Sequence, residues 1–116
     1  MSITFFIPDS PTREVVYDAG GPHEWKTTED IYPSCNFSNI NAYALMARIV
    51  AFAGDMGIPE FDSCGTWTAG QACVVAGAII TMFEHRDVPF GDVARMLRLY
   101  TVLQFAADNE MSVDWS

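Results

Sequence analysis

The sequence has little positive charge. Of its 116 residues, six are Lys or Arg and fifteen are Asp or Glu, which gives a formal net charge of −9 at pH 7. Proteins that bind DNA or RNA neutralise phosphates with Lys and Arg, and anionic membranes attract the same side chains. The shortage therefore argues against direct binding to nucleic acid or to a membrane, and it favours a protein partner whose surface is basic.

Long apolar runs are also missing. The longest uninterrupted one extends from Ala72 to Ile80, far below the roughly 18 residues that a membrane span needs. The N-terminal region has no basic segment followed by an apolar run, so it does not resemble a signal peptide. We therefore expect a soluble protein in the cytoplasm.

The chain contains three cysteines and two histidines, and none of them has the spacing of a metal site. Cys35, Cys64 and Cys73 form no C-x-x-C motif, which fits a reducing compartment. His23 and His85 are isolated from each other and from paired cysteines. We expect no metal, with Cys73 in the core and the other two thiols partly buried.

Motifs of catalysis and of cofactor binding are missing too. The sequence has no G-x-G-x-x-G and no G-x-x-x-x-G-K-[ST] motif, and Lys26 is its only lysine, so phosphate-binding enzymes are disfavoured. A nucleophilic cysteine needs electropositive surroundings, whereas Cys64 follows Glu60 and Asp62. We expect neither enzymatic activity nor a cofactor.

Apolar and aromatic side chains are abundant. Half of the residues are apolar, and they include eight Phe, four Tyr and three Trp, a content that disordered segments do not reach. This length and composition predict a single domain over residues 1–116 with one hydrophobic core.

Two segments at the N-terminus are rich in β-branched and aromatic residues. Residues 3–8 and 13–17 are separated by Asp-Ser-Pro-Thr, a turn composition, so we predict a β-hairpin. Residues 23–39, HEWKTTEDIYPSCNFSN, have the composition of a long loop, although a strand without clear alternation is an alternative. Residues 111–115 alternate and predict a short strand added to the hairpin.

A first helix is predicted over residues 39–53, where apolar side chains recur at helical spacing. Ser38 or Asn39 can accept a hydrogen bond from an N–H group of the first turn, as N-cap residues do. Gly54 supplies a stop signal directly after the last apolar position.

Two further helices follow. Residues 69–85 start after Thr68 in a capping-box pattern, and this helix is apolar almost all round, so it must be surrounded by the rest of the chain. Residues 90–109 have one apolar face, with Asp87 or Asp92 as the candidate N-cap. We predict an α+β fold: a small antiparallel sheet, made of the N-terminal hairpin plus the C-terminal strand, packed with three helices of which the middle one is buried.

The start of the first helix carries an unusual stretch, NFSNINAYALM, at residues 36–46. It is similar to an N-[FM]-[SC]-N-x-N-A stretch in small uncharacterised proteins encoded by tailed bacteriophages and prophages. The chain departs from that pattern because its helix lacks the LLGL ending of those proteins. The resemblance implies no known activity and no catalytic residue. One asparagine can cap the helix, and we expect the others to tie its start to a neighbouring strand or loop.

An acidic, phage-derived protein without a catalytic constellation resembles anti-CRISPR and anti-restriction inhibitors. We therefore hypothesise that it binds and inhibits, stoichiometrically, a nucleic-acid-binding defence complex in the host cytoplasm, for example a CRISPR-Cas component. Its acidic side chains would occupy a groove lined by Lys and Arg in place of phosphate, which predicts fast, salt-sensitive association. The predicted contacts are loop carboxylates and one aromatic anchor: Glu24, Trp25, Glu29, Asp30, Asp55, Glu60 and Asp62.

Two alternatives stay open. The acidic residues lie in ones and twos along the chain, which also fits ordinary solubilising charge. The apolar flank of the second helix could instead support a homodimer, as in a non-catalytic accessory or structural phage protein. A mass that depends on concentration, together with insensitivity to charge reversal, would favour the homodimer.

Overall fold

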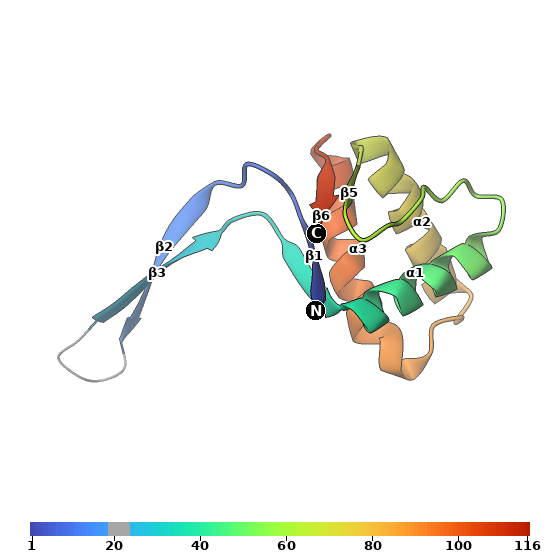
Figure 1. Cartoon of the computed structure of the whole chain (residues 1–116), viewed down its shortest axis with the longest axis horizontal. Helices are drawn as coiled ribbons and strands as arrows, with labels where there is room; N and C mark the ends of the chain where they lie inside the picture. Colours follow the sequence, from blue (N-terminus) through green and yellow to red (C-terminus); the bar gives the residue numbers. More distant parts are fainter. Residues whose placement is uncertain (19–23) are drawn as a thin grey trace.

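The computed structural model describes residues 1–18 and 24–116, and its elements confirm the predicted α+β class. Figure 1 shows a body of helices and a sheet, from which a two-stranded arm extends. The elements in chain order are β1 (Ser2–Phe6), β2 (Thr12–Asp18), β3 (Glu24–Asp30), β4 (Ser34–Ser38), α1 (Asn39–Ala53), β5 (Gly65–Trp67), α2 (Ala69–Glu84), the 3₁₀ turn η1 (Phe90–Asp92), α3 (Val93–Asp108) and β6 (Val113–Trp115).

The sheet of the body is antiparallel, with the strand order β4-β1-β6-β5. Phe5 of β1 lies opposite Cys35 of β4 on one side and opposite Trp115 of β6 on the other. All three side chains are buried, because alternate residues of a strand point to the same face and this face meets the helices. The helices lie together to one side of the sheet (Figure 1).

The predicted N-terminal hairpin is wrong. β1 pairs with β4 and β6 but not with β2, which pairs with β3 instead. The two segments differ in what they bury: Ile3, Phe5 and Ile7 are core residues, whereas β2 contributes none. Pro8 and Pro11 flank the connection, and neither has an N–H group with which to close a hairpin ladder. The C-terminal strand does join β1, between it and β5.

For residues 23–39 the predicted loop is wrong and the alternative, a strand, is confirmed, since the segment contains β3 and β4. β3 pairs with β2 over seven residues, from Thr12 opposite Asp30 to Asp18 opposite Glu24. Polar residues fill almost all of β3, so it lacks the alternation that predicts a strand, and only the pairing with β2 reveals it. His23 lies outside the described residues.

The start and end of α1 agree with the prediction. Ser38 is the N-cap, and its hydroxyl accepts a hydrogen bond from the Asn41 N–H at 3.2 Å. Gly54 follows the helix with a φ of 53°, a conformation that favours glycine. Asn36 ties β4 to β1 as expected of a surplus asparagine, since its Nδ2 donates to Thr4 Oγ1 at 2.7 Å and to Ser2 Oγ at 3.1 Å.

The capping box of α2 is present. Thr68 Oγ1 accepts from the Gln71 N–H, and Gln71 Oε1 accepts from the Thr68 N–H. α3 begins at Val93 rather than at residue 90, because Phe90–Asp92 form a 3₁₀ turn. Asp92 occupies the N-cap position but makes no capping bond, since its carboxylate pairs with Arg48 of α1 at 2.8 Å.

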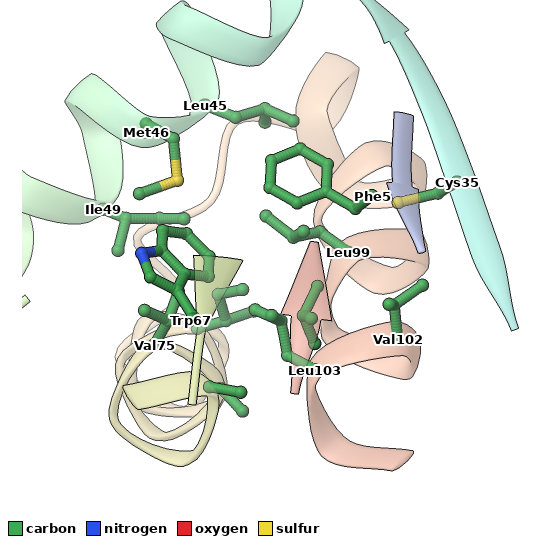
Figure 2. Packing of buried hydrophobic residues seen from close by; sticks show 14 of the residues in the cluster. Phe5, Cys35, Leu45, Met46, Ile49, Trp67, Val75, Leu99, Val102 and Leu103 are labelled. Atoms are coloured by element: carbon green, nitrogen blue, oxygen red, sulfur yellow. The ribbon is translucent and has the colours of Figure 1, made fainter. Parts of the chain in front are cut away.

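The core lies between the sheet and the helices, and Figure 2 shows Phe5, Ile49, Trp67 and Leu99 converging there from four elements. α2 contributes six buried residues. The predicted burial of Cys73 is wrong, because this thiol is exposed. Cys73 lies on the helix face opposite the buried one, and its neighbours at helical spacing are Gly77, Ile80 and Glu84.

Candidate interaction surfaces

The arm consists of β2 and β3, residues 12–18 and 24–30, and it is the most unusual part of the molecule. None of its side chains belongs to the hydrophobic core. The molecule measures 57 × 30 × 27 Å along its principal axes, and Figure 1 shows the arm along the longest of them. A two-stranded ribbon is marginally stable alone in water. Most of its described side chains are exposed, so a partner can contact both of its faces.

The two faces of the arm differ in chemistry, because neighbouring residues of a strand point to opposite sides. One face, the aromatic face, carries Trp25 directly opposite Tyr17, and their exposed fractions are 68 % and 52 %. The other face, the charged face, carries most of the ionic groups. The register assigns Arg13, Val15, Tyr17, Trp25, Thr27 and Glu29 to the aromatic face and Thr12, Glu14, Val16, Glu24, Lys26, Thr28 and Asp30 to the charged face.

Polar contacts connect the two strands. Tyr17 donates its hydroxyl to Glu29 Oε1 at 3.1 Å, and Arg13 Nη2 lies 3.4 Å from Glu29 Oε2. The hydrogen bond to Glu29 and the charge of that carboxylate raise the pKa of Tyr17 above its ordinary value. Glu29 therefore supports the arm itself, alongside the ion pair of Lys26 with Glu14 at 3.6 Å. Glu24 and Asp30 form no ion pair with another described residue.

The root of the arm is closed by two hydrogen bonds between its connecting segments and is held to the body by one packing contact. The Ile31 N–H donates to the Pro11 carbonyl at 2.8 Å, and the Tyr32 N–H donates to Ser10 Oγ at 3.0 Å. The Tyr32 ring packs against Phe105 of α3, with ring centroids 5.2 Å apart. The Tyr32 ring is therefore the part of this root that contacts a helix of the body.

A second acidic surface is the loop between α1 and β5, residues 54–64, which contains Asp55, Glu60 and Asp62 but no Lys or Arg. Two buried tryptophans hold its backbone. Trp67 donates its indole N–H to the Glu60 carbonyl at 3.2 Å, and Trp115 donates to the Asp62 carbonyl at 2.7 Å. The three carboxylate residues are exposed, so a fixed backbone presents them to solvent.

The same loop forms one wall of a groove against α1. Phe61 anchors this wall, since its ring stacks on Trp115 at 5.5 Å between centroids and meets Tyr43 edge-on at 5.2 Å. We call this cavity of about 590 Å³ the α1 groove. Its lining consists of Tyr43, Met46, Ala47, Val50, Ala51, Ile58, Pro59, Glu60 and Phe61.

The residues predicted as partner contacts fall into two separate groups. Glu24, Trp25, Glu29 and Asp30 lie on β3 in the arm, and the other three lie in the 54–64 loop: Asp55, Glu60 and Asp62. Figure 1 shows the arm on one side of the body and the far end of this loop on the opposite side. The two groups therefore belong to different surfaces.

Two features of these surfaces were not predicted from the sequence. Tyr17 joins Trp25 only because β2 and β3 pair, whereas the sequence predicts a hairpin of residues 13–17 with residues 3–8. For the groove, the signal is the width of the apolar stripe on α1: Tyr43, Ala47 and Val50 continue it beyond the buried positions.

The described residues contain few arrangements of side chains that could bind a metal ion or act as a nucleophile. Residues 1–18 and 24–116 contain no group of three or more His, Cys, Asp or Glu side chains that could hold a metal ion. Burial raises the pKa of the Cys35 thiol to about 12, so this sulfur stays protonated. Cys64 and Cys73 are exposed free thiols. Within the same part of the chain, no helix combines the length and the apolar character that crossing a membrane requires.

Comparisons with known proteins add no relative: the chain matches no protein-family model, and neither a curated protein nor a solved structure matches it significantly. Both surfaces expose aromatic side chains, which are enriched in sites that contact another macromolecule.

Proposed function

We propose that the protein binds a host protein through the arm and thereby blocks a basic, nucleic-acid-binding surface of a defence complex, as a phage-encoded inhibitor of the anti-CRISPR type would. The observation that carries this proposal is the arm itself, a ribbon exposed on both faces whose aromatic pair and carboxylates serve no core. Natural proteins seldom leave a Trp and a Tyr side by side in water unless a partner covers them.

The charge of the arm supports the choice of a basic partner. Its strands contain five acidic residues, Glu14, Asp18, Glu24, Glu29 and Asp30, and two basic ones, Arg13 and Lys26, so the net charge is 2 − 5 = −3. A narrow acidic ribbon can enter a groove that normally holds a nucleic-acid strand, where its carboxylates replace phosphates. Attraction of this kind accelerates association, and salt weakens it.

The aromatic face supplies the apolar part of the contact. Trp25 and Tyr17 are rigid, amphipathic side chains of the kinds that dominate binding energy in protein interfaces. Their position beside the Glu29 carboxylate places an apolar anchor next to an acidic group. A partner groove with Arg or Lys around an apolar floor would satisfy both.

The test is a pull-down from bacterial lysate with the tagged protein, washed at low and at high salt. The arm variant combines Glu24→Lys and Asp30→Lys, which leaves the Glu29 contacts intact. The control combines Glu84→Lys and Glu110→Lys in the body, with the same change of net charge. We expect the wild type and the control to retain a stoichiometric nucleic-acid-binding protein that salt releases, and the arm variant to lose it.

The purified partner then permits a direct measurement. The wild type should compete with nucleic acid for the partner, and its association rate should fall as salt rises. Trp25→Ala should increase the dissociation rate, since removal of a central aromatic anchor costs about 2 kcal/mol or more of binding free energy. Equal capture by the arm variant and the wild type, or capture without competition, would overturn the inhibitor proposal.

A self-associating accessory protein without a host target is the second candidate. The observation in its favour is the outer face of α2, which exposes Ile80 at 39 % beside the small residues Cys73 and Gly77. Analytical ultracentrifugation over a range of protein concentrations separates the two candidates. A mass that doubles with concentration in the wild type, but not in Ile80→Glu, would support this candidate.

A further inference from the structure

The α1 groove has the shape of a docking site. Met46, which is buried, forms part of its floor, and Ala47 and Ala51 line it with small side chains. Two larger side chains, Tyr43 on α1 and Phe61 on the loop, also line it, and their rings contact each other at 5.2 Å between centroids. Small residues in the middle of a groove let another backbone approach closely. The axes of two packed helices lie roughly 8–10 Å apart.

The groove exists before any partner binds. The 54–64 loop cannot move away from α1 without breaking the indole hydrogen bonds to the Glu60 and Asp62 carbonyls. It would also have to remove Phe61 from its stack on Trp115. A preformed apolar groove loses little conformational entropy on binding, which favours affinity.

The charge around the groove indicates which kind of partner segment it can bind. Glu60 is the one charged side chain that lines it, and the loop adds Asp55 and Asp62 without a basic residue. Arg48, the only charged residue of α1, is held by Asp92 at 2.8 Å. The lining is therefore apolar apart from the Glu60 carboxylate and contains no basic side chain, which suits an apolar segment flanked by Lys or Arg.

We propose that the α1 groove binds the apolar face of a basic amphipathic helix from a partner protein. The apolar row from Tyr43 to Val50 spans about 10 Å at the rise of an α-helix, which accommodates about two turns of a partner helix. Helix-in-groove recognition uses apolar anchors at i, i+3 or i+4, and i+7. This site lies on a different surface from the arm and does not depend on the function proposed above.

The test uses two synthetic peptides of about eighteen residues, long enough to form an amphipathic helix. Both carry Leu at helical spacing, and the polar positions are Lys in one peptide and Glu in the other. Affinity for the full chain is measured by fluorescence anisotropy. We expect the Leu/Lys peptide to bind at least about tenfold more tightly than the Leu/Glu peptide.

Matched variants separate the groove from the general acidity of the protein. Ala47→Trp fills the groove without a change of charge, and Ala94→Trp places the same side chain on an exposed position of α3. We expect Ala47→Trp to weaken the Leu/Lys peptide at least about tenfold, and Ala94→Trp to change its affinity less than about twofold. A second variant does not change the packing of α1: the neutral pair Glu60→Gln with Asp62→Asn is expected to weaken binding about threefold or more.

Amide chemical-shift mapping on the wild type locates the peptide directly. Shifts should concentrate in α1 and residues 58–61, and the arm variant Glu24→Lys with Asp30→Lys should bind the peptide as the wild type does. Equal weakening by Ala47→Trp and Ala94→Trp, shifts centred on the arm, or no binding at all would overturn this site while leaving the arm proposal untouched. Equal affinity for both peptides would overturn the choice of a basic helix.

Discussion

At the scale of single residues, Gly65 is the position where the fold leaves no room for a side chain. A Cβ atom there would lie 2.7 Å from Cζ2 and 2.9 Å from Cη2 of Trp115. That indole is buried and hydrogen-bonded to the Asp62 carbonyl, so it has little freedom to move. The absence of a side chain at this strand position is what allows the tryptophan to hold the 54–64 loop.

We expect Gly65→Ala to lower the free energy of unfolding by about 1–3 kcal/mol, because the added methyl group overpacks this contact. Urea denaturation followed by tryptophan fluorescence measures the change. The control is Gly77→Ala in α2, where a Cβ meets nothing within 4 Å; it should raise the free energy of unfolding by about 0.5–1 kcal/mol. Equal stability of Gly65→Ala and wild type would contradict the close contact.

The buried Cys35 thiol makes stability depend on alkaline pH. Its pKa is raised from 9.0 to about 12 in the folded protein, chiefly by desolvation. Between these values the unfolded chain loses a proton that the folded chain keeps, so the free energy of unfolding falls as pH rises from 9 to 12. Below pH 9 both states keep the proton, and the effect vanishes.

The comparison of wild type with Cys35→Ala isolates this group from the other titrations. Chemical denaturation at several pH values should show the stability advantage of the wild type shrinking steadily above pH 9. An advantage that stays constant over this range would mean that the thiol is not desolvated in the folded protein.

At the scale of elements, the arm and the body differ in how much they contribute to the hydrophobic core. The body buries all of the core residues, and the arm buries none of them. We expect replacement of residues 12–30 by a short Gly-Ser link to change the free energy of unfolding of the body by less than about 1 kcal/mol, as surface changes generally do. Thermal unfolding followed by near-ultraviolet circular dichroism tests this, since Trp67 and Trp115 report on the core.

A large loss of stability on removal of residues 12–30 would show that the arm is needed to keep Tyr32 packed against Phe105. A variant that keeps the arm but carries Tyr32→Ala serves as the control for that contact, because it removes only the packing against Phe105.

The helices were predicted within a few residues, whereas two of the strands were assigned to the wrong partners. Helix signals are local: Ser38 and Thr68 bond to backbone groups three residues away. Strand pairing is not local, since β1 meets β4 some 30 residues later and β6 more than 100 residues later. The segment 13–17 is rich in β-branched and aromatic residues, which favour a strand with either partner, so composition alone cannot choose.

At the scale of the whole molecule, the net charge of −9 sets the long-range behaviour. Self-repulsion among excess carboxylates destabilises a compact state, and salt screens it. We expect the melting temperature to rise as sodium chloride increases from about 20 to about 200 mM, over which the Debye length falls from roughly 20 to 7 Å. Differential scanning calorimetry measures this, and a fall in melting temperature would show that favourable ion pairs such as Arg48 with Asp92 outweigh the repulsion.

The order of the residues predicted the acidic balance, the abundance of core-forming side chains, and the starts and caps of α1 and α2. Each of these depends on a count or on neighbours within one or two turns. The arm, the pairing of Tyr17 with Trp25 and the α1 groove were not predicted. Each of these brings together residues from different elements, and their positions follow from which strand edge and which helix face the core leaves free. That choice is made by burial of the whole chain, to which distant residues contribute as much as adjacent ones.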